Sequence, residues 1–284
     1  TIELFLTEVM NTVFSFAVSH SMERITIINS GGGVAKTTTA VNLAASLAKS
    51  GSRVLAIDLD GQGTSSDWLS GPAGDQQQLL LDVILGEVSA KDAAQNTYIS
   101  NLDLIPASFH LYQAEKHLAE EIGADSLLKI ALDGVEDEYD YAVIDTPPQL
   151  GILSYNAMIA SPSGLIVPCE ASYKSLKAMK ALMRVINLMK ARRCSEIEML
   201  GILASRVDAR TKSSVQTVDI LRDAFGGLVF DSIINEAVAM KDAPSHHRAV
   251  MDYLPKSKSA KQVTAFSEEV IQRIQSRGVR NAAA

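Results

Sequence analysis

Residues 24–49 read RITIINSGGGVAKTTTAVNLAASLAK and decide the fold. The first six residues are rich in β-branched side chains, which is typical of a buried strand. Three glycines follow, and residues 36–49 then carry a broad apolar stripe at helical spacing, formed by Val41, Leu43, Ala44, Leu47 and Ala48. A strand, a glycine-rich turn and a helix in this order predict the first unit of a parallel α/β sheet.

The rest of the chain continues the alternation. Apolar runs predict strands at residues 53–59, 102–106, 141–145, 164–168 and 200–204. Helical periodicity predicts a helix that follows the strand at 102–106 and ends near Gly123, and further helices at 174–190, 213–225 and 256–277. Residues 61–78 are rich in Gly, Ser, Gln and Asp and are expected to form a loop. The predicted fold is α/β, with a mostly parallel sheet and helices on both faces. We expect residues 22–284 to form one domain.

Residues 1–21 do not fit this pattern. Ile2, Phe5, Leu6, Val9 and Val13 recur at helical spacing, but no basic region precedes them and Glu3 and Glu8 interrupt the run. A secretory signal and a membrane span are therefore not expected. Two interpretations stay open: an added or upstream extension before a start at Met22, or an amphipathic helix that docks on a partner or on the protein itself.

The turn after the first strand predicts a phosphate-binding loop at residues 32–38. Glycines allow the backbone to curl, so that its N–H groups and the helix N-terminus face phosphate oxygens. In such a loop Lys36 would reach the β- and γ-phosphates and the Thr37 hydroxyl would bind Mg²⁺. The nucleotide-binding residues expected from this loop are Gly32, Gly33, Val34, Ala35, Lys36, Thr37 and Thr38.

Acidic residues end two other predicted strands. Asp58 and Asp60 follow the second strand, and Asp145 ends the strand at 141–145. Because ligands of parallel sheets lie beyond the carboxyl ends of the strands, these acids are expected to point toward the phosphate loop. One acid of the first pair would orient the attacking water or act as base, and the other would hold Mg²⁺; Asp145 is expected to hold Mg²⁺ as well. The sequence thus predicts ATP and Mg²⁺ as cofactors.

Together these motifs resemble the ParA/MinD group of P-loop ATPases, which have a deviant Walker A motif. The matching stretches are residues 32–44, DLDGQG at 58–63 and YDYAVIDTPP at 139–148, followed by residues 208–211 and 242–245, which favour ParA over MinD. The resemblance implies an ATPase that forms an ATP-sandwich homodimer, binds double-stranded DNA without sequence preference and hydrolyses ATP slowly until an adaptor protein stimulates it. It also implies a cytoplasmic, nucleoid-associated protein that distributes a cargo and has no membrane partner.

The resemblance assigns roles by position. Asp60 is implied to be the hydrolytic acid and Lys36 a second catalytic residue, and Asp145 is implied to be the Walker B acid. Thr37, Asp60 and Asp145 are the implied metal-binding residues. Two later segments would surround the adenine, and their residues are Ser205, Arg206, Pro244, Ser245 and His246.

Two positions depart from the family pattern. The family has a signature lysine just before the paired glycines, and this chain has Gly31 at that position. The family commonly has a proline after the second acid of the second strand, and this chain has Gly61 there. Loss of a cation beside a polyphosphate weakens charge stabilisation. Three interpretations stay open: an inactive site, an engineered change of lysine to glycine, or replacement by another cation, for which Lys174 is the candidate catalytic residue. The McdA-like ATPases, which position carboxysomes, also lack this lysine, and the chain is similar to them in that respect.

The charge of the chain is divided between its halves. Residues 1–170 hold 7 Lys and Arg against 22 Asp and Glu, whereas residues 171–284 hold 19 against 11, although the whole chain has a net charge of −7. An excess of cations in one part indicates an anionic partner. The candidate DNA-binding residues are Lys190 and Lys212, chosen by charge, and Arg193 and Arg222, which also lie near positions where the resemblance places DNA contacts.

Other classes are less well supported by the sequence. The two cysteines, Cys169 and Cys194, have no CxxC or histidine partner nearby, which argues against a disulfide scaffold or a cysteine metal site. A metabolic ligase or kinase of the same fold would need a second substrate motif, and none is evident. A nucleotide-gated scaffold without catalysis stays open as long as the effect of Gly31 is open.

Overall fold

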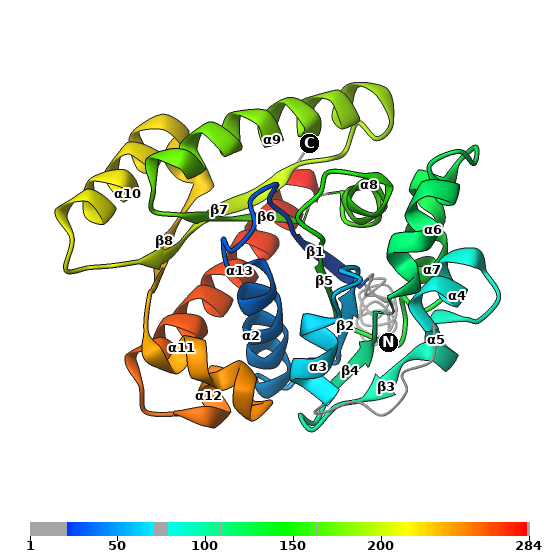
Figure 1. Ribbon diagram of the computed structural model, residues 1–284, viewed down its shortest axis with the longest axis horizontal. Coiled ribbons are helices and arrows are strands. Elements are labelled where there is room, and N and C mark those ends of the chain that lie inside the picture. Colours follow the sequence, from blue (N-terminus) through cyan, green and yellow to red (C-terminus); the bar gives the residue numbers. More distant parts are fainter. Residues whose placement is uncertain (1–21, 71–78, 108, 163, 283–284) are drawn as a thin grey trace, which may run out of the picture.

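The structure is a computed structural model that describes residues 22–70, 79–107, 109–162 and 164–282 (Figure 1). In this part of the chain, eight strands form one sheet. The strand order is β3-β4-β2-β5-β1-β6-β7-β8. The strands are β1 Glu23–Ile27, β2 Val54–Asp58, β3 Gln95–Asn96, β4 Leu102–Ile105, β5 Tyr141–Asp145, β6 Leu165–Glu170, β7 Met199–Val207 and β8 Val229–Asn235. The predicted N-terminal extension, residues 1–21, lies outside the described residues.

The register of the sheet brings the predicted site together. β1 pairs in parallel with β5 on one side and β6 on the other, and β2 pairs in parallel with β5 and β4. Asp58 is opposite Asp145 in this register. Only the short β3, among the strands described, is antiparallel to its neighbour. The carboxyl ends of β1, β2, β4, β5 and β6 therefore lie at one edge, as the sequence predicted.

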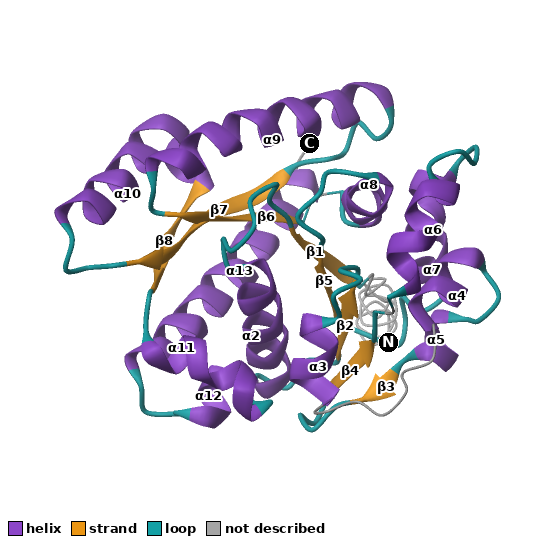
Figure 2. Cartoon of the chain, viewed as in Figure 1, coloured by secondary structure: helices purple, strands orange, loops and turns teal. Residues whose placement is uncertain are grey.

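Helices cover both faces, which confirms the predicted fold class (Figure 2). Side chains alternate along each strand, so Ile25 and Ile27 pack with α2, α12 and α13, whereas Ile28 packs with α8 and α9 on the other face. The helices are α2 Lys36–Lys49, α3 Thr64–Ser70, α4 Leu79–Leu85, α5 Ala90–Ala93, α6 His110–Leu118, α7 Leu127–Asp133, α8 Ile152–Ala160, α9 Tyr173–Arg192, α10 Lys212–Phe225, α11 Val238–Asp242, α12 Val250–Tyr253 and α13 Lys258–Ala282.

Two local expectations from the sequence were wrong or incomplete. The segment predicted as a loop at 61–78 contains the helix α3, because the buried carboxylate of Asp58 accepts hydrogen bonds from the backbone N–H and the hydroxyl of Ser66 at 2.8 and 2.7 Å. Strand β8 was missed because Asp231 and Ser232 interrupt its apolar run. Their backbone N–H groups are bonded by Glu269 of α13, a partner that lies 37 or 38 residues away in the sequence.

None of the helices in the described residues has the length and apolar character needed to cross a membrane.

Candidate nucleotide site

The turn between β1 and α2 has the backbone conformation of an anion-binding loop. Gly33 and Ala35 both adopt left-handed conformations, with φ of 73° and 69°. Such a conformation is unusual for alanine, and it concentrates at functional sites. Alternating left- and right-handed residues turn successive N–H groups toward one concave side, where the N-terminus of α2 also points. The loop can therefore present backbone N–H groups to phosphate oxygens.

Side chains fix this loop to the sheet. The Asn29 side chain accepts a hydrogen bond from the Gly31 N–H at 2.9 Å and donates one to the Pro168 carbonyl of β6 at 2.7 Å. The Lys36 ammonium donates to the Gly31 carbonyl at 3.1 Å, and the residue as a whole is 8% exposed. Burial lowers the pKa of Lys36, while the charges of Asp145 and Asp60 act in the opposite direction. Lys36 is thus a buried cation that lies between acids and the phosphate loop.

Asp145, at the end of β5, has one carboxylate oxygen engaged and one free. Its Oδ2 accepts a hydrogen bond from the Ser65 hydroxyl at 2.6 Å, while its buried Oδ1 has no hydrogen-bond partner among the residues described. Burial raises the pKa of Asp145 to about 6, although the nearby hydroxyls of Ser65 and Thr37 oppose this rise. An unpartnered buried carboxylate oxygen beside a threonine hydroxyl is what a hydrated Mg²⁺ ion would satisfy. The residues present therefore fit the ion that Thr37 and Asp145 were predicted to hold.

Asp58 and Asp60 have different roles, which corrects the expectation that both point toward the phosphates. Asp58 is fully buried and accepts hydrogen bonds from Asp60 N, Ser66 N and the Ser66 hydroxyl. Burial, together with the charge of Asp145, raises the pKa of Asp58 to about 8. Asp60 is half-buried and lines the pocket beside the loop. Asp58 therefore anchors the turn, and Asp60 is the acid that faces the site.

A pocket of about 470 Å³ opens beside the loop. One wall comes from the phosphate loop and Asp60. The other comes from the C-terminal part of the chain. Of the residues predicted from the sequence, those that line the pocket are Gly32, Gly33, Ala35, Lys36, Thr37, Thr38, Asp60, Arg206 and Pro244. Residues that sequence reasoning missed are Pro148, Ile234, Asn235, Glu236, Ala237, Met240 and Lys241.

The residues predicted to surround the adenine are placed in different ways. Arg206 donates to the Gly33 carbonyl at 2.7 Å and lies 3.5 Å from Glu236, so it joins both walls. Ser205 is fully buried and its hydroxyl donates to the carbonyl of Val34, another buried residue. Ser245 and His246 are exposed and are not among the pocket-lining residues. The His246 ring lies 4.6 Å from the Tyr253 ring instead, so the structure does not bring these two residues to the pocket.

The comparisons with known proteins agree with this site. The family described as AAA domain matches residues 22–199. The chain is 35% identical to the sporulation initiation inhibitor protein Soj of Bacillus subtilis, over 87% of this chain and 97% of Soj. It is 35% identical to the chromosome partitioning protein ParA of Caulobacter vibrioides, over 88% and 94%. The chain belongs to the ParA/MinD family of P-loop ATPases.

Solved structures with the fold of this ATPase family are also similar to the chain. Cobyrinic acid a,c-diamide synthase from Mycobacterium smegmatis, with an ATP analogue and magnesium bound, is 28% identical, with a TM-score of 0.78 over 90% of this chain and 96% of that one. McdA from Cyanothece without nucleotide is 25% identical, with a TM-score of 0.79 over 89% and 99%. This ParA/MinD-type chain is thus an ATPase, and ATP with Mg²⁺ is the cofactor of its phosphate loop.

Gly31 is the position at which this ParA/MinD-type chain lacks the signature lysine. A Cβ added there would lie 2.8 Å from Cγ1 of the buried Val34, so any side chain at residue 31 requires Val34 to move. The backbone of Lys174 lies in the first turn of α9, which follows β6 beside β1. Its side chain lies outside the described part of the structure, so its predicted catalytic role stays a prediction. Arg206 and Lys241 are the pocket-lining cations, besides Lys36, in the described chain.

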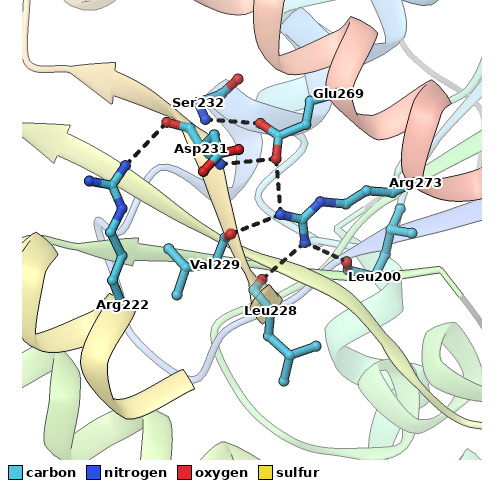
Figure 3. Close-up of polar contacts among 8 residues, drawn as sticks. All are labelled: Leu200, Arg222, Leu228, Val229, Asp231, Ser232, Glu269 and Arg273. Atoms are coloured by element: carbon cyan, nitrogen blue, oxygen red, sulfur yellow. Dashed lines mark hydrogen bonds and ion pairs between the residues drawn. The ribbon is translucent and has the colours of Figure 1, made fainter. Parts of the chain in front are cut away.

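The four predicted DNA-binding cations are exposed and lie in α9 and α10 or at their ends. Lys190 is 3.2 Å from Glu198, and Arg193 is 3.2 Å from Asp125. Arg222 donates to the Asp231 carbonyl at 3.4 Å, next to the Glu269–Arg273 network that joins α13 to β8 (Figure 3). Lys212 begins α10 and Arg222 lies in its last turn, so about 15 Å of helix separates them. Their role in DNA binding stays a prediction.

Proposed function

We propose that the chain is a positioning ATPase whose ATP-bound homodimer binds double-stranded DNA without sequence preference and distributes a cargo with an adaptor protein that stimulates hydrolysis. The proposal places it in the cytoplasm, associated with the nucleoid. The observation that supports the proposal is that the phosphate loop, Asp60 and Asp145 all lie at the same edge of the sheet in a chain of this family.

Each group in the site has a role in this proposal. The loop N–H groups and Lys36 bind the phosphates, and Lys36 reaches the γ-phosphate after leaving the Gly31 carbonyl that it contacts here. Thr37, Asp145 and Asp60 would hold Mg²⁺, and the ion would neutralise phosphate charge. The Asp60 carboxylate also orients the attacking water and accepts its proton. Arg206 and Pro244 contact the nucleoside from the other wall.

A missing lysine at residue 31 is compatible with catalysis in this proposal because other cations are available. Arg206 and Lys241 line the pocket, and the backbone of Lys174 lies in the first turn of α9. The cargo is a plasmid, a chromosome or a carboxysome. The higher identity to Soj and ParA than to McdA favours a DNA cargo.

The DNA part of the proposal rests on charge. Counterion release at phosphates makes nonspecific binding steeply dependent on salt. We expect DNA retention with ATP and Mg²⁺, little retention with ADP, and a decline as salt rises from 50 to 200 mM. Retention that is absent with ATP at 100 mM salt would refute this part of the proposal.

A matched pair of variants tests where the DNA lies. Lys190→Glu and Lys91→Glu each reverse one exposed lysine that is paired with a glutamate, Glu198 in one case and Glu138 in the other. Since Lys190 lies in the basic part of the chain, its reversal should weaken retention, whereas reversal of Lys91 should leave it nearly unchanged. Equal effects would show that net charge alone decides binding.

A second candidate function is a nucleotide-gated scaffold without catalysis, which the absence of a lysine at residue 31 favours. Phosphate release measured with Mg²⁺-ATP, DNA and the cognate adaptor separates the two. A scaffold would bind nucleotide and DNA without releasing phosphate above the level of the Asp60→Ala variant.

A further inference from the structure

The pocket acid Asp60 has a partner that neither the sequence nor the family pattern assigned. The Tyr112 hydroxyl donates a hydrogen bond to Asp60 Oδ1 at 2.7 Å, and the Gln62 N–H donates to the same oxygen at 3.0 Å. Tyr112 lies in α6, which follows β4, and β4 is the parallel neighbour of β2. The sheet order therefore brings a tyrosine from one crossover beside the acid that follows another strand.

Gly61 is the reason why the tyrosine ring can lie so close. A Cβ added at Gly61 would be 2.7 and 2.8 Å from Cδ2 and Cε2 of Tyr112, well inside van der Waals contact. Gly61 is buried, and its backbone φ is not in the left-handed region. The glycine is thus required by space rather than by backbone conformation. The ring of Tyr112 occupies the room that a side chain at residue 61, including the proline common in the resembled pattern, would take.

The surroundings hold the ring in this place. Phe109 contacts the Tyr112 ring edge to face, with centroids 6.4 Å apart. The Ser66 hydroxyl accepts a hydrogen bond from Ala107 N at 2.9 Å while it donates to Asp58, so α3, which follows β2, is joined to the segment after β4. The chain segments that carry Asp60 and Tyr112 are therefore connected by a second hydrogen bond besides the Tyr112–Asp60 contact.

We infer that Tyr112 is a positioning residue for Asp60 and that Gly61 is the residue that admits its ring. Two donors on Oδ1 fix the plane of the carboxylate, which keeps the second oxygen in one direction relative to the phosphate loop. A fixed base needs no reorientation as it takes the proton of the attacking water, so the effect falls on the catalytic step rather than on nucleotide binding. This inference rests on the proposed role of Asp60 in hydrolysis.

The first experiment removes only the hydroxyl. In Tyr112→Phe, we expect kcat for ATP hydrolysis with Mg²⁺ and double-stranded DNA to fall about tenfold, as loss of one hydrogen bond to a charged group predicts, while KM for ATP stays within twofold. Tyr139→Phe is the matched control, because the Tyr139 hydroxyl donates to the carboxylate of Asp103 at 2.9 Å away from the pocket. The control should leave both constants unchanged.

The second experiment tests the role of Gly61. In Gly61→Ala the new methyl group displaces the Tyr112 ring, so kcat should fall as in Tyr112→Phe. In a Tyr112→Ala background the space is empty, and Gly61→Ala should then have no further effect on kcat. Additive losses in this double-mutant cycle would overturn the role of Gly61.

Other outcomes separate this inference from the proposed function. If Tyr112→Phe keeps kcat within twofold of the unmodified chain, Tyr112 does not position the acid. The same conclusion follows if kcat falls equally in Tyr112→Phe and in the control Tyr139→Phe. If Asp60→Ala itself hydrolyses ATP at the unmodified rate, the proposed role of Asp60 fails first. Loss of hydrolysis in Asp60→Ala together with full activity in Tyr112→Phe would overturn the inference alone.

Discussion

The two walls of the nucleotide pocket differ in how the chain builds them. The phosphate wall comes from one continuous loop, residues 32–38, with Asp60 added from the segment after β2, which is separated from β1 by β5 in the sheet. The opposite wall combines Arg206 from β7, residues 234–237 around the end of β8, and Met240, Lys241 and Pro244 from the segment that follows. One wall depends on backbone conformation and the other on the packing of several elements.

This difference teaches which interactions can be lost. A loop that presents backbone N–H groups keeps most of its donors when one side chain changes, but it depends on its buried cation, Lys36. The opposite wall is tied to the loop through Arg206, whose guanidinium contacts Gly33 on one side and Glu236 on the other. We therefore expect large effects from the phosphate wall and smaller ones from the opposite wall.

The largest effect is expected for Lys36→Ala. This change removes the cation that faces the phosphates and leaves Asp145 and Asp60 without its charge, so ATP affinity should fall about 100-fold or more, as loss of two bonds to charged groups predicts. Titration with a fluorescent ATP analogue measures it. Lys49→Ala, at the exposed C-terminal end of the same helix, is the control. Equal affinity in the two variants would remove Lys36 from phosphate binding.

Asp145→Asn should have the next largest effect. The change keeps the shape of the buried side chain but removes the charge that Mg²⁺ requires, so the Mg²⁺ concentration for half-maximal hydrolysis should rise on the order of 10-fold to 100-fold. Ser65→Ala is the comparison, because it removes only the hydrogen bond to the other oxygen of Asp145 and should have a smaller effect. An unchanged Mg²⁺ requirement in Asp145→Asn would contradict this metal site.

On the opposite wall, Arg206→Ala should reduce ATP affinity about 3-fold to 10-fold. The arginine is 40% exposed and makes its bond to a loop carbonyl, so its loss loosens the loop without removing a phosphate donor. Calorimetry with ATP and Mg²⁺ measures it, and Arg206→Lys should recover part of the loss. A loss as great as that of Lys36→Ala would contradict the difference between the walls.

The smallest effect on nucleotide affinity is expected for Lys174→Ala, whose effect on hydrolysis tests a separate question. If Lys174 replaces the missing lysine of residue 31, hydrolysis with DNA and adaptor should fall about tenfold and nucleotide affinity should change little. Phosphate release and DNA retention measure it, with Lys180→Ala on the same helix as the control. Unchanged turnover would remove Lys174 from the mechanism and leave Arg206 and Lys241 as the cations of the pocket.

The sequence alone predicted the phosphate wall, because its donors are backbone groups of one short motif and its acids end strands that apolar runs reveal. The motif order also predicted the parallel sheet. The different roles of Asp58 and Asp60 could not be read from the sequence, since they depend on which carboxylate Ser66 binds in the folded chain.

Tertiary structure also decided the rest of the site. The residues around β8 line the pocket because β7 and β8 bring them to the same sheet edge, and a strand with polar residues gave no clear pattern in the sequence. The contact of Tyr112 with Gly61 and Asp60 joins residues about fifty positions apart. The sequence by itself determined the chemistry of phosphate binding, which is local. Only the packing of the crossovers decided the other wall and the restraint on Asp60, because those contacts exist only when separate strands lie side by side.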